Sequence, residues 1–133
     1  MRIVVFDTQA LLKLYFGEPG AEKVEEYLKG VLEKKIKGYI NLVTLTELCY
    51  VLCRVSETMA KEKDRNLRSF GVKVVSVRDN SELWREAALI KALHPLSLAD
   101  AFGAATAILL KATLITGADT EFDQVKNLKI EHV

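Results

Sequence analysis

Four acidic residues lie at positions along the chain where they could bind a divalent cation. Asp7 and Asp119 each follow a short apolar run, and Glu47 and Asp100 each stand three residues after a Thr or Ser typical of a helix start. Carboxylate oxygens are the ligands that hard cations such as Mg²⁺ and Mn²⁺ prefer. Such an ion can orient a water, lower its pKa and stabilise the oxyanions of an in-line attack on phosphorus. We therefore interpret these four acids as a candidate catalytic metal site.

Two threonines stand close to these acids in the sequence. Thr8 follows Asp7 directly, and Thr116 ends the apolar run that precedes Asp119. A hydroxyl at either position could hold a water or a phosphate oxygen beside the bound ion.

Each acid, taken alone, also fits an ordinary structural role. Glu47 and Asp100 fit the last position of a capping box, with Thr44 and Ser97 as the N-caps. Asp7 could cap a helix, and Asp119 could lie in a turn. These roles do not require four acids at one end of one sheet. Clustered carboxylates repel one another, and a divalent cation is the simplest group that offsets this repulsion.

The composition is that of a globular domain. The chain has 133 residues, of which 50% are hydrophobic and 28% charged, and its formal net charge is +1. We expect one domain over residues 1–133. The net charge is not the strongly positive one of a protein that binds nucleic acid by electrostatics alone. No apolar run reaches the ~18–20 residues that cross a bilayer, so no membrane association is expected. Cys49 and Cys53 form no disulfide framework, and the expected location is cytoplasmic.

Hydrophobic periodicity predicts strands that alternate with helices. This order indicates parallel βαβ units and an α/β fold, a three-layer α/β/α sandwich with a short, mainly parallel sheet. Ligands bind such sheets at the carboxyl ends of the strands, where the four acids are expected. The predicted strands span residues 3–6, 39–43, 72–77, 113–116 and 130–133, and the predicted helices span 8–16, 57–69 and 79–93, with others beginning at Ala21, Thr44 and Ser97.

Four motifs resemble those of PIN-domain nucleases, and most closely those of VapC-type toxins. They are FDTQALLK at residues 6–13, TEL at 46–48, LSLADA at 96–101 and ITGADTEF at 115–122. The similarity runs from the first predicted strand to about residue 125, and the Ser-Leu-Ala-Asp and Thr-Gly-x-Asp segments carry most of its specificity.

The resemblance implies an activity, a cofactor and partners. It implies a Mg²⁺- or Mn²⁺-dependent endoribonuclease acting on single-stranded or exposed RNA, as the toxin of a toxin–antitoxin pair, with a homodimer and a small antitoxin protein as partners. By motif position, the metal ligands would be Asp7, Glu47, Asp100 and Asp119, and Thr116 would be the accompanying catalytic hydroxyl.

Two positions depart from the family pattern. The family commonly has a small hydroxyl residue or Asn two residues after the first Asp, where this chain has Gln9, so Thr8 is the candidate replacement. The last motif often has a second Asp before its aromatic residue, and Glu121 occupies that place here as a candidate fifth ligand.

Two other functions remain open. A catalytically silent PIN-like domain could bind RNA or act as a scaffold. A different α/β phosphoryl enzyme is disfavoured, because the chain has neither a G-x-G-x-x-G nor a G-x-x-x-x-G-K-[ST] motif.

His94 and His132 lie outside the acidic motifs, so we expect metal-held water rather than histidine to act as the base. Lysines at residues 34–37 are candidate RNA contacts but fit a solvated surface better.

Overall fold

The computed structural model describes residues 1–133 and contains one five-stranded sheet in which every pairing is parallel. The order across the sheet is β3-β2-β1-β4-β5, so the first strand lies at its centre and β5 lies at an edge. The strands are β1 (Arg2–Phe6), β2 (Ile36–Asn41), β3 (Lys73–Val75), β4 (Thr113–Thr116) and β5 (Lys129–His132).

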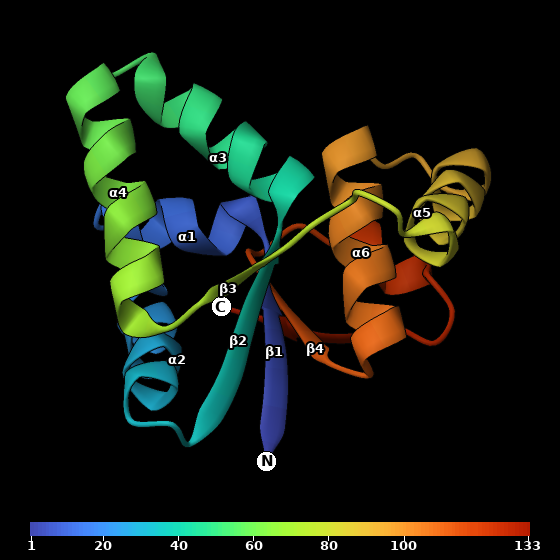
Figure 1. The fold of residues 1–133 in the computed structure, drawn as a ribbon, viewed down its shortest axis with the longest axis horizontal. Coiled ribbons are helices and arrows are strands. Elements are labelled where there is room, and N and C mark those ends of the chain that lie inside the picture. The colour runs from blue at the N-terminus through green and yellow to red at the C-terminus, as the bar shows by residue number, and fades with distance from the viewer.

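Helices cover both faces of this sheet. Figure 1 shows α1, α2 and α4 on one side of the strands and α6 with α5 on the other. The predicted three-layer α/β/α sandwich is thus confirmed. The helices are α1 (Thr8–Tyr15), α2 (Ala21–Leu32), α3 (Leu42–Cys53), α4 (Glu57–Phe70), α5 (Ser81–Leu93) and α6 (Leu98–Leu110), and a short 3₁₀ helix, η1, spans Glu121–Gln124. None of these helices has the length and apolar character needed to cross a membrane.

The central strand is buried on both faces. Val4 and Phe6 point into one hydrophobic cluster, which contains side chains of α1 to α4, and Val5 points into a second cluster with α5 and α6. All three residues are fully buried. Alternate residues of a strand point to opposite faces, so an uninterrupted apolar run is what a strand between two helical layers requires.

The chain changes direction across the sheet between β1 and β4. From β1 it builds outward through β2 to β3, and it then returns to the other side of β1 to form β4. In open parallel sheets such a reversal leaves a crevice at the carboxyl ends of the two strands. The residues that follow β1 and β4, Asp7 and Gly117, therefore mark the expected position of a site.

The predicted boundary between the second strand and the third helix was wrong. β2 ends at Asn41, and Leu42 and Val43 belong to α3, although their apolar character is typical of a strand. The Asn41 side chain accepts a hydrogen bond of 2.7 Å from the Val43 N–H and donates one of 2.9 Å to the Thr106 hydroxyl on α6. Asn41 is therefore the N-cap of α3, in place of the predicted Thr44. β3 is also shorter than the predicted strand over residues 72–77.

Candidate functional site

Asp7 and Thr116 join the carboxyl ends of the two central strands. The Asp7 backbone N–H donates to the Ile115 carbonyl at 2.9 Å, and the Thr116 hydroxyl donates to Asp7 Oδ2 at 2.8 Å. The same carboxylate oxygen accepts from the Gln9 backbone N–H, so Asp7 also caps α1. Both side chains are buried, with 1% of Asp7 and none of Thr116 exposed. The capping role predicted for Asp7 is therefore real, but it uses only one of the two carboxylate oxygens.

The second oxygen of Asp7, Oδ1, is buried without a hydrogen-bond partner. Burial is the main cause that raises the pKa of Asp7 from 3.8 to about 7, and repulsion from Asp100 and Glu47 adds to it. The hydrogen bonds from Thr116 and Gln9 act in the opposite direction but do not offset these effects. A buried carboxylate with a free oxygen, next to other acids, is an environment that favours a bound cation or proton.

Glu47 and Asp100 come from helices that meet above the strands, where Figure 1 shows the beginning of α3 close to the beginning of α6. Gly103 of α6 faces Thr44 of α3 at this point, since a Cβ on Gly103 would lie 3.4 Å from the Thr44 hydroxyl, in van der Waals contact. Burial and then repulsion from Glu47 raise the pKa of Asp100 to about 6, despite hydrogen bonds from Ser97. The two carboxylates therefore lie within electrostatic range of each other.

The capping alternatives hold for one of these acids only. Ser97 caps α6 and accepts from the Asp100 backbone N–H at 3.1 Å, as the capping-box interpretation predicted. Because α3 begins at Leu42, Glu47 lies beyond its first turn and cannot complete a box with Thr44. Glu47 therefore has no capping role in this structure.

Asp119 and Glu121 belong to the segment that follows β4. The Gln9 side-chain amide donates to Asp119 Oδ2 at 2.9 Å, and this ties the segment to the first turn of α1. Glu121 begins η1 and contributes to the repulsion that raises the pKa of Asp100. All the predicted acids thus lie around the carboxyl ends of β1 and β4, although Asp119 is linked to Asp7 through Gln9 rather than directly.

The two predicted hydroxyls differ in position. Thr116 donates to Asp7, as described above, whereas the Thr8 hydroxyl donates to the Thr44 carbonyl at 3.4 Å and is buried. Thr8 therefore links α1 to α3 and does not contact the acids by a hydrogen bond.

The donor set fits a hydrated cation. No three Asp, Glu, His or Cys side chains converge on one point at metal-ligand distance. Mg²⁺ usually keeps several waters and takes only one or two carboxylates directly, so an ion at this site would be held partly through water. The partnerless Asp7 Oδ1 is the oxygen with a free coordination position.

Two residues near the acids have contacts that the sequence did not predict. The side chain of Gln9, which departs from the expected motif, donates a hydrogen bond to Asp119. His132, for which no role was predicted, contacts the Gly117 carbonyl at 2.7 Å and Asp123 Oδ1 at 2.9 Å. For the Gln9 contact, the only indication in the sequence was the position of Gln9 two residues after Asp7. For the His132 contacts, the neighbouring sequence gives no indication. Cys49 and Cys53 are free thiols on α3 and contact no acid of the site by a hydrogen bond.

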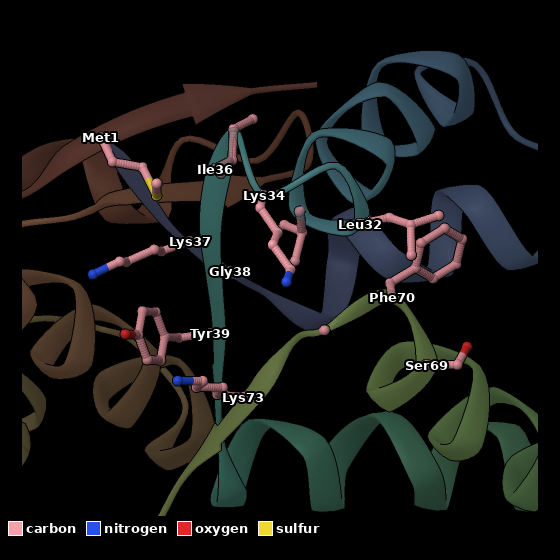
Figure 2. Close-up of a pocket in the computed structure, with 12 residues that line it drawn as sticks. Met1, Leu32, Lys34, Ile36, Lys37, Gly38, Tyr39, Ser69, Phe70 and Lys73 are labelled. Atoms are coloured by element: carbon pink, nitrogen blue, oxygen red, sulfur yellow. The ribbon is translucent and has the colours of Figure 1, made fainter.

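A cavity lies at the opposite end of the sheet. It has a volume of about 490 Å³ and is bounded by the start of β2 and the ends of α2 and α4. Figure 2 shows Lys37 and Tyr39 on one side of β2, with Leu32, Lys34 and Phe70 on the other. Lysines of the predicted basic run are here, far from the carboxyl ends of the strands. The cavity is therefore separate from the acidic site.

Comparison with known proteins identifies a family. A family model described as "PIN domain" matches residues 4–128. A comparison with curated proteins finds no match.

Solved structures with the same fold include several complexes. The chain superposes on the DNA-bound VapBC structure from Salmonella typhimurium with a TM-score of 0.75, at 16% identity over 99% of this chain and 98% of that chain. For VapBC2 from Rickettsia felis, bound to a DNA fragment from its promoter, the TM-score is 0.74 at 17% identity, with 98% of each chain covered. A toxin–antitoxin complex from Klebsiella pneumoniae gives a TM-score of 0.71 at 20% identity, with 94% of each chain covered. At these identities the likeness establishes the fold.

Proposed function

The chain belongs to the PIN domain family, and from this membership we propose that it is a divalent-metal-dependent endoribonuclease. It would hydrolyse phosphodiester bonds in single-stranded or exposed RNA. The observation that carries the proposal is the buried, partnerless Oδ1 of Asp7 among other carboxylates. A structural cap needs one oxygen and would not leave the other one buried and unsatisfied, since such burial costs free energy.

Asp7, Glu47, Asp100 and Asp119 would hold Mg²⁺ or Mn²⁺, and Glu121 is the candidate for a fifth carboxylate. When bound, the ion supplies Lewis-acid stabilisation of the phosphate oxygens and lowers the pKa of water. The raised pKa values of Asp7 and Asp100 mean that metal binding must displace protons near neutral pH, so affinity would rise with pH.

Two other side chains of this chain would orient those ligands. Thr116 donates to Asp7 Oδ2, and Gln9 donates to Asp119 Oδ2. Hydrogen bonds of this kind fix a carboxylate in one rotamer and favour its ionised form. Thr116 is fully buried and donates to Asp7. Its role would therefore be to hold this ligand in place.

The partners proposed for the chain follow from its structural neighbours and its surface. The similar structures described above are toxin–antitoxin complexes by name, which supports a toxin role and an antitoxin partner for this chain. A homodimer is supported by large apolar side chains that are exposed on α5 and at the start of α6: Trp84, Leu89, Leu93 and Leu98. Its RNA substrate and its free cysteines fit the cytoplasm.

The direct test is cleavage of labelled single-stranded RNA by the purified protein with Mg²⁺ or Mn²⁺. We expect cleavage that EDTA abolishes and that an Asp100→Asn variant lowers by at least ~100-fold, because the variant loses a charged ligand. Asp79→Asn, at an exposed position beside Arg78 and outside the predicted set of acids, is the matched control. Equal cleavage by Asp100→Asn, or cleavage undiminished by EDTA, would disprove the mechanism. RNA binding without cleavage in Mn²⁺ would identify a silent RNA-binding domain, and a parallel arm with single-stranded DNA tests substrate class.

A further inference from the structure

The ring of His132, at the end of β5, lies between two hydrogen-bond acceptors. Its Nδ1 is 2.7 Å from the Gly117 carbonyl oxygen, and its Nε2 is 2.9 Å from Asp123 Oδ1. A carbonyl and an ionised carboxylate can only accept, so each ring nitrogen must donate a proton. The contacts therefore require the doubly protonated imidazolium form of His132.

The groups in contact with His132 favour that form. The contact with the Gly117 carbonyl is the main cause that raises the pKa of His132; burial acts in the opposite direction, and the hydrogen bond and charge of Asp123 add to the rise. Its neighbour Glu131 instead accepts from Arg2 at 2.8 Å, away from the ring. Lys13 of α1 packs against Gly117, but its ammonium donates to the Pro19 carbonyl at 3.2 Å. Asp123 is thus the carboxylate in contact with the ring.

The two acceptors bracket the segment that contains Asp119 and Glu121. Gly117 lies at the start of this segment and Asp123 lies in η1, so one ring connects its two ends. The pairing of β4 with β5 brings Thr116 opposite His132, and this places the ring beside the segment.

We propose that His132 is a positioning residue that holds the segment over residues 117–123 in the conformation in which Asp119 and Glu121 face the other acids. This inference rests on the proposed function, because that function makes Asp119 and Glu121 of this segment candidate metal ligands. Gln9 holds Asp119 from one side, and His132 holds the backbone of the same segment from the other. The His132 and Asp123 side chains are 36% and 40% exposed, so their ion pair adds little to global stability. Loss of the ring should therefore loosen the segment without unfolding the protein.

The experiment compares His132→Ala, His132→Asn and His132→Gln with wild type. Asn places an amide near Nδ1 and can keep the Gly117 contact, whereas Gln reaches toward Asp123. His94→Ala is the control, because His94 has no side-chain hydrogen bond and lies at the end of α5. Calorimetric titration with Mn²⁺ should show about tenfold weaker binding for the alanine variant, intermediate values for Asn and Gln, and no change for the control.

Two measurements keep the test independent of catalysis. Amide hydrogen exchange over residues 118–123, measured without metal, should speed up in His132→Ala and not in His94→Ala. Ring ¹⁵N shifts should show His132 protonated on both nitrogens at pH 6, and Asp123→Asn should lower its pKa. Unchanged exchange and unchanged Mn²⁺ affinity in His132→Ala, or a ring that is neutral at pH 6, would overturn the proposal. If the wild type cuts no RNA, the proposed function fails, while the exchange and ring measurements still decide the role of His132.

Discussion

Replacing Asp7 with asparagine should stabilise the metal-free protein at neutral pH while it abolishes nuclease activity. Asparagine is an equally good N-cap, so its oxygen can accept from the Gln9 N–H and from the Thr116 hydroxyl as Oδ2 of Asp7 does. Its amide would take the place of the partnerless Oδ1, where it faces other carboxylates as a donor rather than as a like charge. The change therefore keeps the local contacts and removes only the ionisation.

The magnitude follows from the pKa of Asp7. Its rise from 3.8 to about 7 means that the folded chain keeps a proton that the unfolded chain releases between those pH values. The free energy of unfolding therefore falls as the pH rises through this window, by about 1.4 kcal/mol per pH unit. The total is about 4 kcal/mol at pH 7.5 and about 2 kcal/mol at pH 5, and it disappears below pH 4. The asparagine side chain does not titrate, so the Asp7→Asn variant should gain these amounts over wild type.

Urea unfolding in EDTA at pH 5 and pH 7.5 measures the difference, provided that both proteins have the same m-value. Asp79→Asn makes the same chemical change at an exposed position and should leave stability nearly unchanged. Mn²⁺ should then raise the stability of wild type more than that of Asp7→Asn, because a ligand that binds only the folded state stabilises it. An Asp7→Asn variant that is no more stable than wild type at pH 7.5, or whose gain is the same at both pH values, would refute the reasoning.

Three further changes test other parts of the structure. Gly117→Ala should weaken Mn²⁺ binding about tenfold in a calorimetric titration, because the new Cβ would lie 2.8 Å from Gln9 Oε1 and displace the amide that holds Asp119. Identical affinity would show that this amide does not matter. Asn41→Ala should lower the free energy of unfolding by about 1–3 kcal/mol in urea, since it removes the cap of α3 and leaves the Thr106 hydroxyl without its donor. A change within error would contradict the capping role. Trp84→Lys should convert a dimer to a monomer in light scattering without a fall in Tm, because the side chain is 48% exposed in one chain. A dimer that persists would exclude this part of α5 from the interface.

Local patterns were sufficient to predict most of the fold. β4 spans the predicted residues, and β1 was recognisable because an apolar run without alternation suits a strand covered on both faces. The boundary of β2 failed because Leu42 and Val43 have the composition of a strand. Their helical conformation depends on Asn41, whose cap is held in place by Thr106 on a distant helix. No window of local sequence contains that contact.

The candidate site, like the fold, could be predicted only in part from the sequence. The acids could be placed at one end of the sheet from the order of strands and helices, because parallel strands share the position of their carboxyl ends. The contacts that orient them could not be predicted. Gln9 reaches Asp119 across a sequence separation of 110 residues, and His132 reaches Gly117 only because β5 pairs with β4. These contacts depend on the path of the segment after β4, and the motif over residues 115–122 does not indicate which distant side chains this segment meets.

The position of β1 at the centre of the sheet has a consequence for synthesis of the chain. The strand is made before the strands with which it pairs, and its pairing with β4 and the hydrogen bond from Thr116 to Asp7 span 109 residues. Asp100 and Asp119 are also made long after Asp7. A growing polypeptide can therefore pack its first helices while one side of β1 is still unpaired. Under the proposed function, nuclease activity would begin only after translation has passed β4 and completed the site.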